Sequence, residues 1–461
     1  MQSFDLIVIG SGPGGYRAAV LATLRGLSVA IAEAGAWGGC CLNRGCVPKK
    51  AWHHTARLIA NNSHYAERGV TGRLTADLEQ AWEHQHKVVN TVRDSYTDYM
   101  KRLGINAFQG TASFIDAHTV DIGGTNITAK HIIIATGSSP FVPQEYPLAA
   151  GRILTTDDLF DQPVPAGRKV AIVGSGVIGS EFAFILSQLG CEVVWLSNST
   201  PLSRSEFSAP ALKILHKALK QTGIVTHKRA TRVGLLDDGV ELAFADGTNV
   251  KVDWVLLGSG RIPHTTALHP ERAGVKLDEK GFVQVNAHLQ TAASHIYAIG
   301  DVANPRMTAN QALADAAVAV ANILKPDTRK QTPAAVPELV YSAVELGRIG
   351  LNEDDAEDAG LEVATGFAAF ESNPRALGQD DTEGFVRLIA DMDNGDLLGA
   401  EVVGTEAGEI IHSIIQQFGR DDALARFAGS FYNHPARSEE IQNAAETLAA
   451  KWGLSEQVFG A

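Results

Sequence analysis

The order of apolar and polar positions in residues 5–33 returns in residues 169–197. Both segments run through a short apolar stretch, a glycine-rich turn, an amphipathic stretch and a second apolar stretch. This order predicts a buried strand, a helix and a second buried strand in each segment. Four glycines keep their places with a shift of 164 positions, so that Gly10, Gly12, Gly15 and Gly26 match Gly174, Gly176, Gly179 and Gly190. The repeat predicts two α/β units of the same kind.

Each glycine-rich turn has the spacing G-x-G-x-x-G between a predicted strand and a predicted helix. In this motif the first glycine permits a tight turn, the second lets a pyrophosphate approach the backbone, and the third lets helix and strand pack closely. The helix N-terminus offers unpaired N–H groups to the phosphates. One copy would be weak evidence, but two copies in one register predict two dinucleotide-binding units.

The two units differ where their second strand ends. Glu33 stands there in the first unit, and Ser197 takes the same place in the second. A carboxylate at this position accepts hydrogen bonds from an adenosine ribose, and in a nicotinamide site it favours NAD over NADP. The sequence therefore leaves NAD(H) and NADP(H) both open for the second unit.

Composition and charge exclude several classes of partner. The chain of 461 residues has a formal net charge of -13, which argues against nucleic acid and anionic membrane surfaces. The N-terminus enters an apolar strand pattern without the basic region of a signal peptide, and the apolar runs are too short to span a bilayer. Four cysteines form no disulfide framework in a chain of this length. We expect a cytoplasmic protein.

Two of these cysteines, Cys41 and Cys46, lie in a glycine-rich stretch that ends in Pro48-Lys49-Lys50. Their spacing predicts that both stand on one helix beginning near Cys41, close enough to form a reversible disulfide. A helix N-terminus would lower the thiol pKa and keep a thiolate available near neutral pH. Zinc is disfavoured because the neighbouring His53 and His54 lack a recognisable ligand spacing, so we expect no metal site.

With its two glycine fingerprints, this stretch resembles the class I FAD-dependent pyridine nucleotide–disulfide oxidoreductases, the family of dihydrolipoamide dehydrogenase and glutathione reductase. The resemblance runs nearly the full length of the chain. It implies an α/β fold with two Rossmann-like domains, for FAD and NAD(P), and an α+β dimerisation domain at the C-terminus. The expected boundaries are 1–147 for the first FAD segment, 148–265 for the NAD(P) domain, 266–336 for the second FAD segment and 337–461 for the dimerisation domain.

The resemblance also assigns catalytic roles. Cys41 would be the thiol that exchanges with the substrate, and Cys46 the thiol on the flavin side. Lys50 would contact the flavin near N5, where positive charge stabilises the reduced form. Glu181 occupies the place of the glutamate that pairs with this lysine.

The stretch 433–439 resembles the C-terminal His-Pro-x-x-Ser-Glu motif of the family. There the histidine is the acid/base and the glutamate orients it, and the pair faces the redox cysteine of the other subunit. His434 and Glu439 take these places, and a neutral imidazole suits the removal of a thiol proton. The segment from residue 439 to 454 also has a long helical pattern.

The resemblance also implies which residues bind the cofactors, and these residues form two sets. The residues expected to bind FAD are Gly10, Gly12, Gly14, Gly15, Glu33, Lys50, Gly110, Ala112, Ala135, Thr136, Gly137, Gly300 and Asp301. The residues expected to bind NAD(H) or NADP(H) are Gly174, Gly176, Gly179, Ser197, Arg204, Gly260 and Arg261.

Four residues in the cysteine and histidine motifs depart from the usual pattern of the family, and His264, after the stretch 259–263, stands where Asn is usual. Cys40 replaces a threonine or similar residue, and is either an inert side chain or a third thiol. Arg44 replaces a valine between the cysteines, where it would favour a thiolate, point to solvent or select an acidic partner. Ala436 and Arg437 replace the usual residues inside the histidine motif and would change the mouth of the substrate channel.

Details at several positions relate the chain to two members of the family. Residues 12–16 and 407–411 are closer to dihydrolipoamide dehydrogenases, whereas residues 48–50 and Arg204 are closer to glutathione reductase. We therefore expect a homodimeric, dihydrolipoamide dehydrogenase-like enzyme that oxidises a lipoyl dithiol on a small protein or domain. The alternatives are an NADPH-dependent reductase of glutathione or another small disulfide, and a flavin-bearing interaction subunit without turnover.

Overall fold

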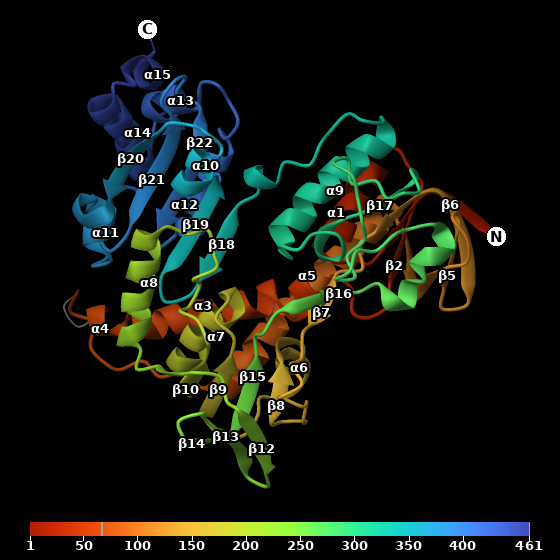
Figure 1. Cartoon of the computed structure of the whole chain (residues 1–461), viewed down its shortest axis with the longest axis horizontal. Coiled ribbons are helices and arrows are strands. Elements are labelled where there is room, and N and C mark those ends of the chain that lie inside the picture. The colour runs from red at the N-terminus through yellow and green to blue at the C-terminus, as the bar shows by residue number, and fades with distance from the viewer. Residues whose placement is uncertain (66–67, 461) are drawn as a thin grey trace. The chain divides into compact units, whose positions relative to one another are not determined.

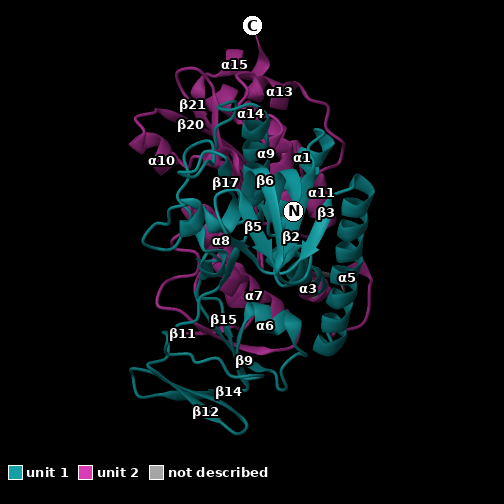
Figure 2. Ribbon diagram, turned by 90° about the vertical axis from the view of Figure 1, so that its right-hand side faces the viewer, with its two compact units in different colours: residues 1–55, 76–174, 228–331 teal, residues 56–75, 175–227, 332–461 magenta. Residues whose placement is uncertain are grey.

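The computed structural model describes residues 1–65 and 68–460, and its elements divide the chain into two units. The units are shown in separate colours in Figure 2 and are built from interleaved segments. Unit 1 consists of residues 1–55, 76–174 and 228–331; unit 2 consists of residues 56–75, 175–227 and 332–461. The expected α/β class is confirmed, whereas the four domain boundaries stay predictions.

The first sheet of unit 1 is built around β1 (Gln2–Ile9), which pairs in parallel with β2 (Val29–Glu33) and β6 (Thr125–Ile134). The strand order is β3-β2-β1-β6-β5-β4, and β17 pairs with β6 as well. The remaining strands are β3 (Asn106–Gln109), β4 (Ala112–Phe114), β5 (Thr119–Ile122) and β17 (Ile296–Ala298). Strands β1, β2, β3, β6 and β17 run in parallel, so their carboxyl ends share one edge of the sheet.

Both faces of this sheet are buried where the carboxyl-terminal halves of its central strands β1 and β6 are apolar. Leu6 and Val8 share a core with α1 (Pro13–Leu24) and α9 (Ala309–Leu324), which lie side by side in Figure 1. Ile7 and Ile9 point into a second core on the opposite face. The continuous apolar run that predicted a buried strand is explained by this burial on both sides.

The second copy of the repeat forms β9 (Lys169–Val173), α7 (Val177–Gln188) and β10 (Glu192–Leu196), as predicted. In unit 1, β15 (Trp254–Leu257) pairs in parallel with β9 and with β8 (Ile153–Thr155). In unit 2, β10 pairs in parallel with β11 (Val225–His227). Unit 1 also contains two small antiparallel sheets. One has three strands, β12 (Arg232–Leu236), β13 (Gly239–Ala243) and β14 (Asn249–Val252). The other has two, β7 (Ser138–Pro140) and β16 (Arg261–Pro263).

The C-terminal part of unit 2 is a five-stranded antiparallel sheet with helices packed on it. Its strand order is β18-β19-β22-β21-β20, and its apolar core includes residues from helices α12, α13 and α14. The strands are β18 (Glu338–Tyr341), β19 (Glu345–Gly350), β20 (Val363–Ala369), β21 (Phe385–Asp391) and β22 (Leu397–Val403). The helices are α12 (Ala407–Ile415), α13 (Ala423–Gly429), α14 (Glu439–Trp452) and α15 (Ser455–Phe459).

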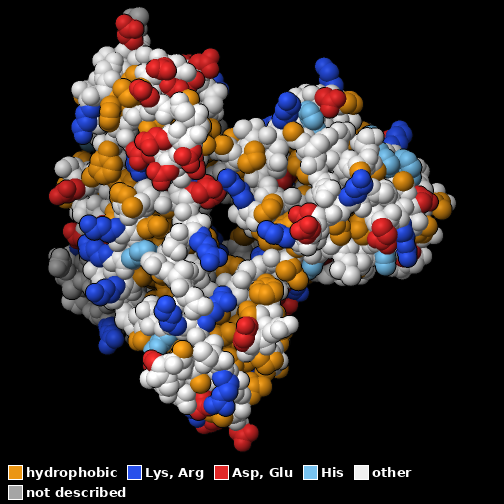
Figure 3. Space-filling model, viewed as in Figure 1, with side chains coloured by type: hydrophobic (Ala, Val, Ile, Leu, Met, Phe, Trp, Pro, Cys, Tyr) orange, Lys and Arg blue, Asp and Glu red, His pale blue; other side chains and the backbone are white. Residues whose placement is uncertain are grey.

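Further helices lie outside these layers: α4 (Asn62–Tyr65), α5 (Leu78–Leu103), α6 (Thr156–Asp161), α8 (Ala209–Gln221), α10 (Glu353–Asp358) and α11 (Pro374–Gly378). The N-cap Asp77 begins α5, accepting hydrogen bonds from the backbone of residues 79 and 80, and Gly104 ends it in the left-handed conformation. Acidic side chains gather over the part of unit 2 that contains α10 (Figure 3). Over residues 1–65 and 68–460, none of the helices combines the length and the apolar character that a membrane span requires.

Candidate active site

The glycine turn between β1 and α1 has the geometry that a dinucleotide pyrophosphate needs. Gly10 has a φ of +105°, and a Cβ added there would lie 2.2 Å from the carbonyl oxygen of Ala135. A Cβ on Gly15 would lie 1.9 Å from the carbonyl oxygen of Gly10. By contrast, a Cβ on Gly12, the N-cap residue of α1, would have no neighbour within 4 Å. The space in front of Gly12 and the helix N-terminus therefore fit the phosphates of FAD.

Glu33 lies beside this turn, at the end of β2, as the sequence predicts. Its carboxylate accepts hydrogen bonds from the Ser11 backbone N–H at 3.0 Å and from the Ser11 hydroxyl at 2.6 Å. The Ser11 oxygen in turn accepts a hydrogen bond from the Gly38 N–H at 2.9 Å. These contacts fasten the segment before the cysteines to the phosphate turn. The role of Glu33 toward a ribose stays a prediction.

The other residues expected to bind FAD lie close to the carboxyl edge of the first sheet. Gly110 follows β3, residues 135–137 follow β6, and residues 300–301 follow β17. Ala112 begins β4, which adjoins Gly110 in the chain. In open α/β sheets the ligand binds outside the carboxyl ends of the parallel strands, so this arrangement fits the cofactor.

The cysteine stretch packs directly against the phosphate turn. Helix α2 (Gly39–Asn43) begins there, and a Cβ on Gly39 would lie 2.7 Å from the Cα of Gly12. The Asn43 side-chain amide donates to the carbonyl oxygen of Gly39 at 2.8 Å and to that of Trp37 at 3.0 Å. Its oxygen accepts a hydrogen bond from Arg93 of α5 at 2.9 Å. Asn43 thus holds the start of α2 in place and joins it to α5.

The prediction that both cysteines stand on one helix is wrong. Cys41 belongs to α2, whereas Cys46 is the first residue of a separate helix, α3 (Cys46–Ala60). The chain leaves the helical conformation at Arg44, which has a φ of -140°. A Cβ on Gly45 would lie 3.2 Å from the carbonyl oxygen of Cys40, so glycine favours the close approach of the two helices. Tertiary contact, rather than helical spacing, brings the cysteines together.

The side chains of Cys41 and Cys46 form a hydrogen-bonded pair of free thiols. The hydrogen bond to Cys46 raises the pKa of Cys41 well above its ordinary value, and burial and the charge of Cys46 act in the same direction. The expectation of a lowered pKa therefore fails for Cys41. When the pair has lost one proton, this direction favours keeping the remaining proton on Cys41.

Cys40 is a third thiol in the same site. Its sulfur accepts a hydrogen bond from the Arg261 guanidinium at 3.4 Å and lies 3.9 Å from the carboxylate of Asp157. Burial raises the pKa of Cys40 to about 11, although the charge of Arg261 opposes this shift. The geometry supports the inert alternative, because a thiol with this pKa stays protonated at neutral pH.

Arg44 is engaged in ion pairs with helix α6. Its guanidinium lies 2.7 Å from the carboxylate of Asp161 and 3.7 Å from that of Asp157. Burial alone would lower the pKa of Arg44, but the hydrogen bond and charge of Asp161, together with Asp157, leave it raised. The structure therefore disfavours two of the alternatives for Arg44, namely that its side chain points to solvent and that it selects an acidic partner. Its partners on α6 are distant in the chain, so no local sequence pattern indicates them.

Arg261, expected to contact NAD(P), reaches toward Asp301 in unit 1. It donates to the Ser138 hydroxyl at 2.7 Å, and that hydroxyl donates to the Asp301 carboxylate at 2.5 Å. The sequence alone did not indicate Ser138, because a serine after a strand has no distinctive pattern.

Tyr96 of α5 is a second residue that the sequence alone did not indicate, and it stacks on Tyr16 at 4.1 Å between ring centres. Burial raises the pKa of Tyr96, and the charges of both redox cysteines add to the shift.

The second fingerprint repeats the geometry of the first. Gly174 has a φ of +123°, and a Cβ added there would lie 2.3 Å from the carbonyl oxygen of Gly258. Gly176 is the N-cap residue of α7, and Gly179 is buried in its first turn. At the end of β10, Ser197 donates to the carbonyl oxygen of Ser199 at 2.6 Å.

The remaining nucleotide-site residues do not decide between NAD and NADP. Arg204 is exposed, in the loop that follows Ser197. Gly260 precedes β16 and has a φ of +122°. Both residues keep their assignment as predictions.

Lys50 and Glu181 lie in different units, so their predicted pairing stays a prediction. Lys50 is on the first turns of α3, downstream of Cys46. Glu181 is buried in α7, and its carboxylate accepts a hydrogen bond from the Tyr341 N–H at 2.7 Å.

The histidine motif (residues 433–439) brings its two predicted residues into contact. His434 Nδ1 lies 2.8 Å from one oxygen of Glu439, and the Ala436 N–H donates to the other oxygen at 2.7 Å. The hydrogen bond from Ala436 and the one from His434 hold the pKa of Glu439 below its ordinary value. The His434 side chain is 71% exposed, and the peptide bond to Pro435 is cis. This geometry gives an imidazole with one nitrogen fixed by a carboxylate and its ring open to a ligand.

Outside residues 66, 67 and 461, no group of three or more His, Cys, Asp and Glu side chains is arranged to hold a metal ion.

Known proteins match the chain along almost its whole length. The family profile described as pyridine nucleotide-disulphide oxidoreductase matches residues 4–321, and the profile of the corresponding dimerisation domain matches residues 336–445. The dihydrolipoyl dehydrogenase of Thermus scotoductus is 33% identical over 459 residues, covering 97% of this chain and 98% of the relative. The dihydrolipoyl dehydrogenase of Staphylococcus aureus is 32% identical over 452 residues, covering 96% of each chain.

Two solved structures have the same fold. LpdA from Mycobacterium tuberculosis has a TM-score of 0.89 at 24% identity, covering 97% of this chain and all of that one (100%). The HOCl-induced flavoprotein disulfide reductase RclA from Escherichia coli has a TM-score of 0.82 at 25% identity, covering 97% of this chain and 99% of that one.

Proposed function

Because the chain belongs to the pyridine nucleotide-disulphide oxidoreductase family, we propose that it acts as a dihydrolipoyl dehydrogenase. The family and its dihydrolipoyl dehydrogenases use FAD and NAD(H). The substrate is a dihydrolipoyl group, and the electrons pass to NAD(P)+. The observation that carries the proposal is the contact between Cys41 and Cys46 beside the phosphate turn.

The chemistry begins with a proton transfer. His434, oriented by Glu439, removes the proton from one substrate thiol, and the resulting thiolate attacks the sulfur of Cys41 in the oxidised pair. The bond between Cys41 and Cys46 breaks, a mixed disulfide forms, and Cys46 leaves as a thiolate. The second substrate thiolate attacks the substrate sulfur of the mixed disulfide and releases Cys41, so that the two electrons now reside on the cysteine pair.

The hydrogen bond between the cysteines then separates their roles. Cys41 holds a proton while Cys46 carries the negative charge, which leaves Cys46 as the electron donor. Bound FAD supplies the two-electron relay between this thiolate and a nicotinamide dinucleotide. Gly10, Gly12 and Gly15 would hold its pyrophosphate, and Lys50 would supply positive charge beside the ring, with Glu181 as the partner of this lysine that the family resemblance predicts.

We infer that the enzyme is a homodimer, in which His434 serves the cysteines of the partner subunit. The dimerisation domain supports this inference, as does Phe431, a fully exposed aromatic side chain close to His434 in the chain. We also place the enzyme in the cytoplasm, where thiols are kept reduced.

Steady-state kinetics of the FAD-loaded protein test the proposal. We expect turnover of dihydrolipoamide with NAD+ or NADP+, and the preferred nucleotide will be the one with the higher kcat/KM. Cys46→Ser should abolish this turnover, because no disulfide can form. Substantial dihydrolipoamide oxidation by the Cys46→Ser variant would contradict the mechanism.

A second candidate function is the reduction of a glutathione-like disulfide by NADPH. It is favoured by the end of β10, where Ser197 stands in place of a carboxylate and the exposed Arg204 follows. Rapid reduction of oxidised glutathione by NADPH, without oxidation of dihydrolipoamide, would select this candidate.

A further inference from the structure

Arg437, inside the histidine motif, is buried in unit 2. Its side chain is 1% exposed, and its guanidinium lies 5.1 Å from the centre of the Phe370 ring. Nε donates to the side-chain oxygen of Gln379 at 3.0 Å, and Nη2 donates to the backbone carbonyl oxygen of Asp381 at 2.5 Å. The same nitrogen lies 3.5 Å from the Asp381 carboxylate. Arg437 therefore does not line the mouth of a channel, as its position in the motif had suggested.

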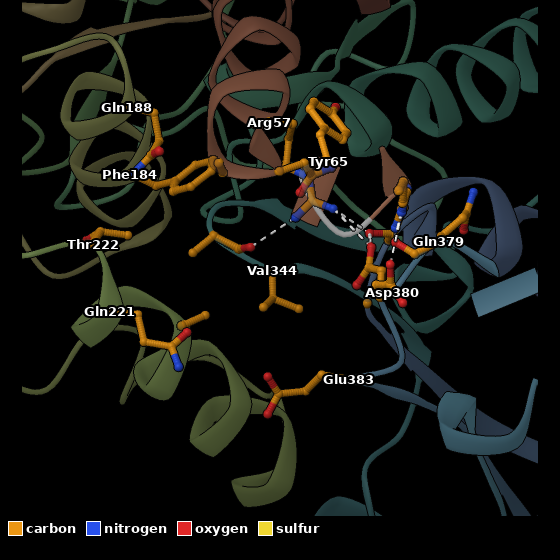
Figure 4. Close-up of a pocket in the computed structure, with 18 residues that line it drawn as sticks. Arg57, Tyr65, Phe184, Gln188, Gln221, Thr222, Val344, Gln379, Asp380 and Glu383 are labelled. Carbon is orange, nitrogen blue, oxygen red and sulfur yellow. Dashed lines mark hydrogen bonds and ion pairs between the residues drawn. The ribbon is translucent and has the colours of Figure 1, made fainter. Parts of the chain in front are cut away.

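Asp381 is shared with a second arginine. The guanidinium of Arg57 lies 3.4 Å from the same carboxylate oxygen and donates to the carbonyl oxygen of Ala343 at 3.2 Å. The Thr405 hydroxyl is hydrogen-bonded both to Arg57 and to Asp381. Figure 4 shows Arg57 directed toward the segment that contains Gln379 and Asp380, along one side of a cavity of about 340 Å³. Arg57 belongs to α3, the helix that begins at Cys46.

The histidine motif depends on this region for its position. His434 is exposed, and the residues before α14 have no helix of their own to hold them. The only other side chain that anchors the motif from outside, among the hydrogen bonds of the described residues, is Asn373, which donates to the Ala436 carbonyl oxygen at 3.0 Å. Asn373 also caps α11, the short helix that leads into Gln379 and Asp381. Both anchors therefore converge on residues 373–381.

Stability alone is a poor explanation for the buried arginine. Burial lowers the pKa of Arg437, and the charge of Asp381 opposes this shift. Within the described part of the chain, Nη1 of Arg437 has no hydrogen-bond partner. A buried ion pair that leaves a donor unused is often no more stable than an apolar replacement, whereas it does fix the geometry of the groups it joins.

We propose that Asp381, held between Arg57 and Arg437, is a positioning residue that keeps the His434–Glu439 pair in place for proton transfer with the substrate thiol. The inference rests on the proposed function and adds to it a residue that touches neither substrate nor cofactor. One carboxylate then anchors both the histidine motif and the helix that carries Cys46 at its start.

The adjacent residue supplies a matched control. Asp380 lies on the same segment and forms an ion pair with Arg68 at 2.9 Å, but among the described residues no hydrogen bond or ion pair joins its side chain to the histidine motif. We would compare Asp381→Asn with Asp380→Asn. Because Asp381→Asn leaves Arg437 buried without its counter-charge, the double variant Asp381→Asn/Arg437→Met is included, with Asp380→Ala as a further control at the neighbouring position.

Three readouts separate positioning from folding: kcat/KM for dihydrolipoamide as a function of pH, the rate at which NADH reduces an artificial acceptor through the flavin, and the melting temperature. A correctly placed general base contributes about 10²–10⁴-fold, so we expect the Asp381 variants to lose about tenfold or more in kcat/KM. Their acidic pH limb should shift, while artificial-acceptor reduction by both variants and the melting temperature of the double variant stay close to those of the wild type. The Asp380 variants should match the wild type in all three.

Other outcomes would overturn the inference. Asp381 variants whose dithiol kinetics and pH profile equal those of the Asp380 variants would show that the carboxylate does not position the motif. Equal losses of dithiol turnover, artificial-acceptor reduction and melting temperature would assign Asp381 a purely structural role. The assay is also run as disulfide reduction by NADPH; if the wild type turns over in neither direction, the proposed function itself fails, and this inference with it.

Discussion

At the scale of single residues, the site is organised by which sulfur carries charge and which carries a proton. Cys41 and Cys46 share a hydrogen bond that raises the pKa of Cys41, and Cys40 is kept neutral by burial. Of the three neighbouring thiols, Cys40 and Cys41 are thus the two that hold a proton. Only one of them, Cys46, is suited to donate electrons in the proposed mechanism.

This difference predicts a selective alkylation pattern. The pKa of Cys40 is raised to about 11, so its thiol stays protonated at every pH well below that value and becomes reactive only as the pH approaches it. Iodoacetamide near neutral pH should therefore modify Cys46 of the NADH-reduced protein and spare Cys40, as measured by mass spectrometry of the peptides that contain the two cysteines. Modification of Cys40 at neutral pH, or loss of dithiol turnover in Cys40→Thr, would contradict its inert role.

At the scale of elements, short helices and turns place these residues. The phosphate turn and α2 meet at Gly39, where a Cβ would lie 2.7 Å from the Cα of Gly12. Helix α2 meets the start of α3 at Gly45, where a Cβ would lie 3.2 Å from the carbonyl oxygen of Cys40. The redox pair is consequently held by the same turn that fits the pyrophosphate. A change in this turn is expected to affect the fold or the cofactor, depending on which glycine is replaced.

Two alanine substitutions separate these effects. Gly15→Ala places a Cβ 1.9 Å from the carbonyl oxygen of Gly10, so it should destabilise unit 1 by about 1–3 kcal/mol or more and prevent FAD binding. Gly12→Ala meets no atom within 4 Å and should leave the melting temperature of the apoprotein unchanged while weakening FAD binding. Thermal unfolding and titration with FAD, followed by flavin fluorescence, measure both. Equal destabilisation by the two substitutions would refute this assignment of the glycines.

The elements also show what the sequence could and could not predict. The two copies of strand, turn, helix and strand were predictable, because glycine spacing and apolar runs are local signals. The last long helix was predicted at residues 439–454 and is found at Glu439–Trp452. The break between Cys41 and Cys46 was not predictable, because it depends on the contact of Gly45 with Cys40. The partners of Arg44 and the burial of Arg437 come from segments distant in the chain, and neither leaves a local pattern.

At the scale of the whole molecule, each unit contributes a different part of the chemistry. Unit 1 contains the cysteine pair and the phosphate turn, and unit 2 contains the histidine motif and Glu181. The net charge of -13 favours neither nucleic acid nor anionic lipid as a partner. The dimerisation domain of the family, which matches residues 336–445, contains the histidine motif (residues 433–439).

The most direct test of this account is the absorption spectrum of the bound flavin when dihydrolipoamide is added without oxygen. We expect the wild-type spectrum to change at once, because electrons enter through Cys41 and leave through Cys46, and we expect no change in Cys41→Ser. NADH should change the flavin spectrum in both proteins. A wild-type spectrum that responds to NADH but not to dihydrolipoamide would contradict the central claim that this chain oxidises a lipoyl dithiol.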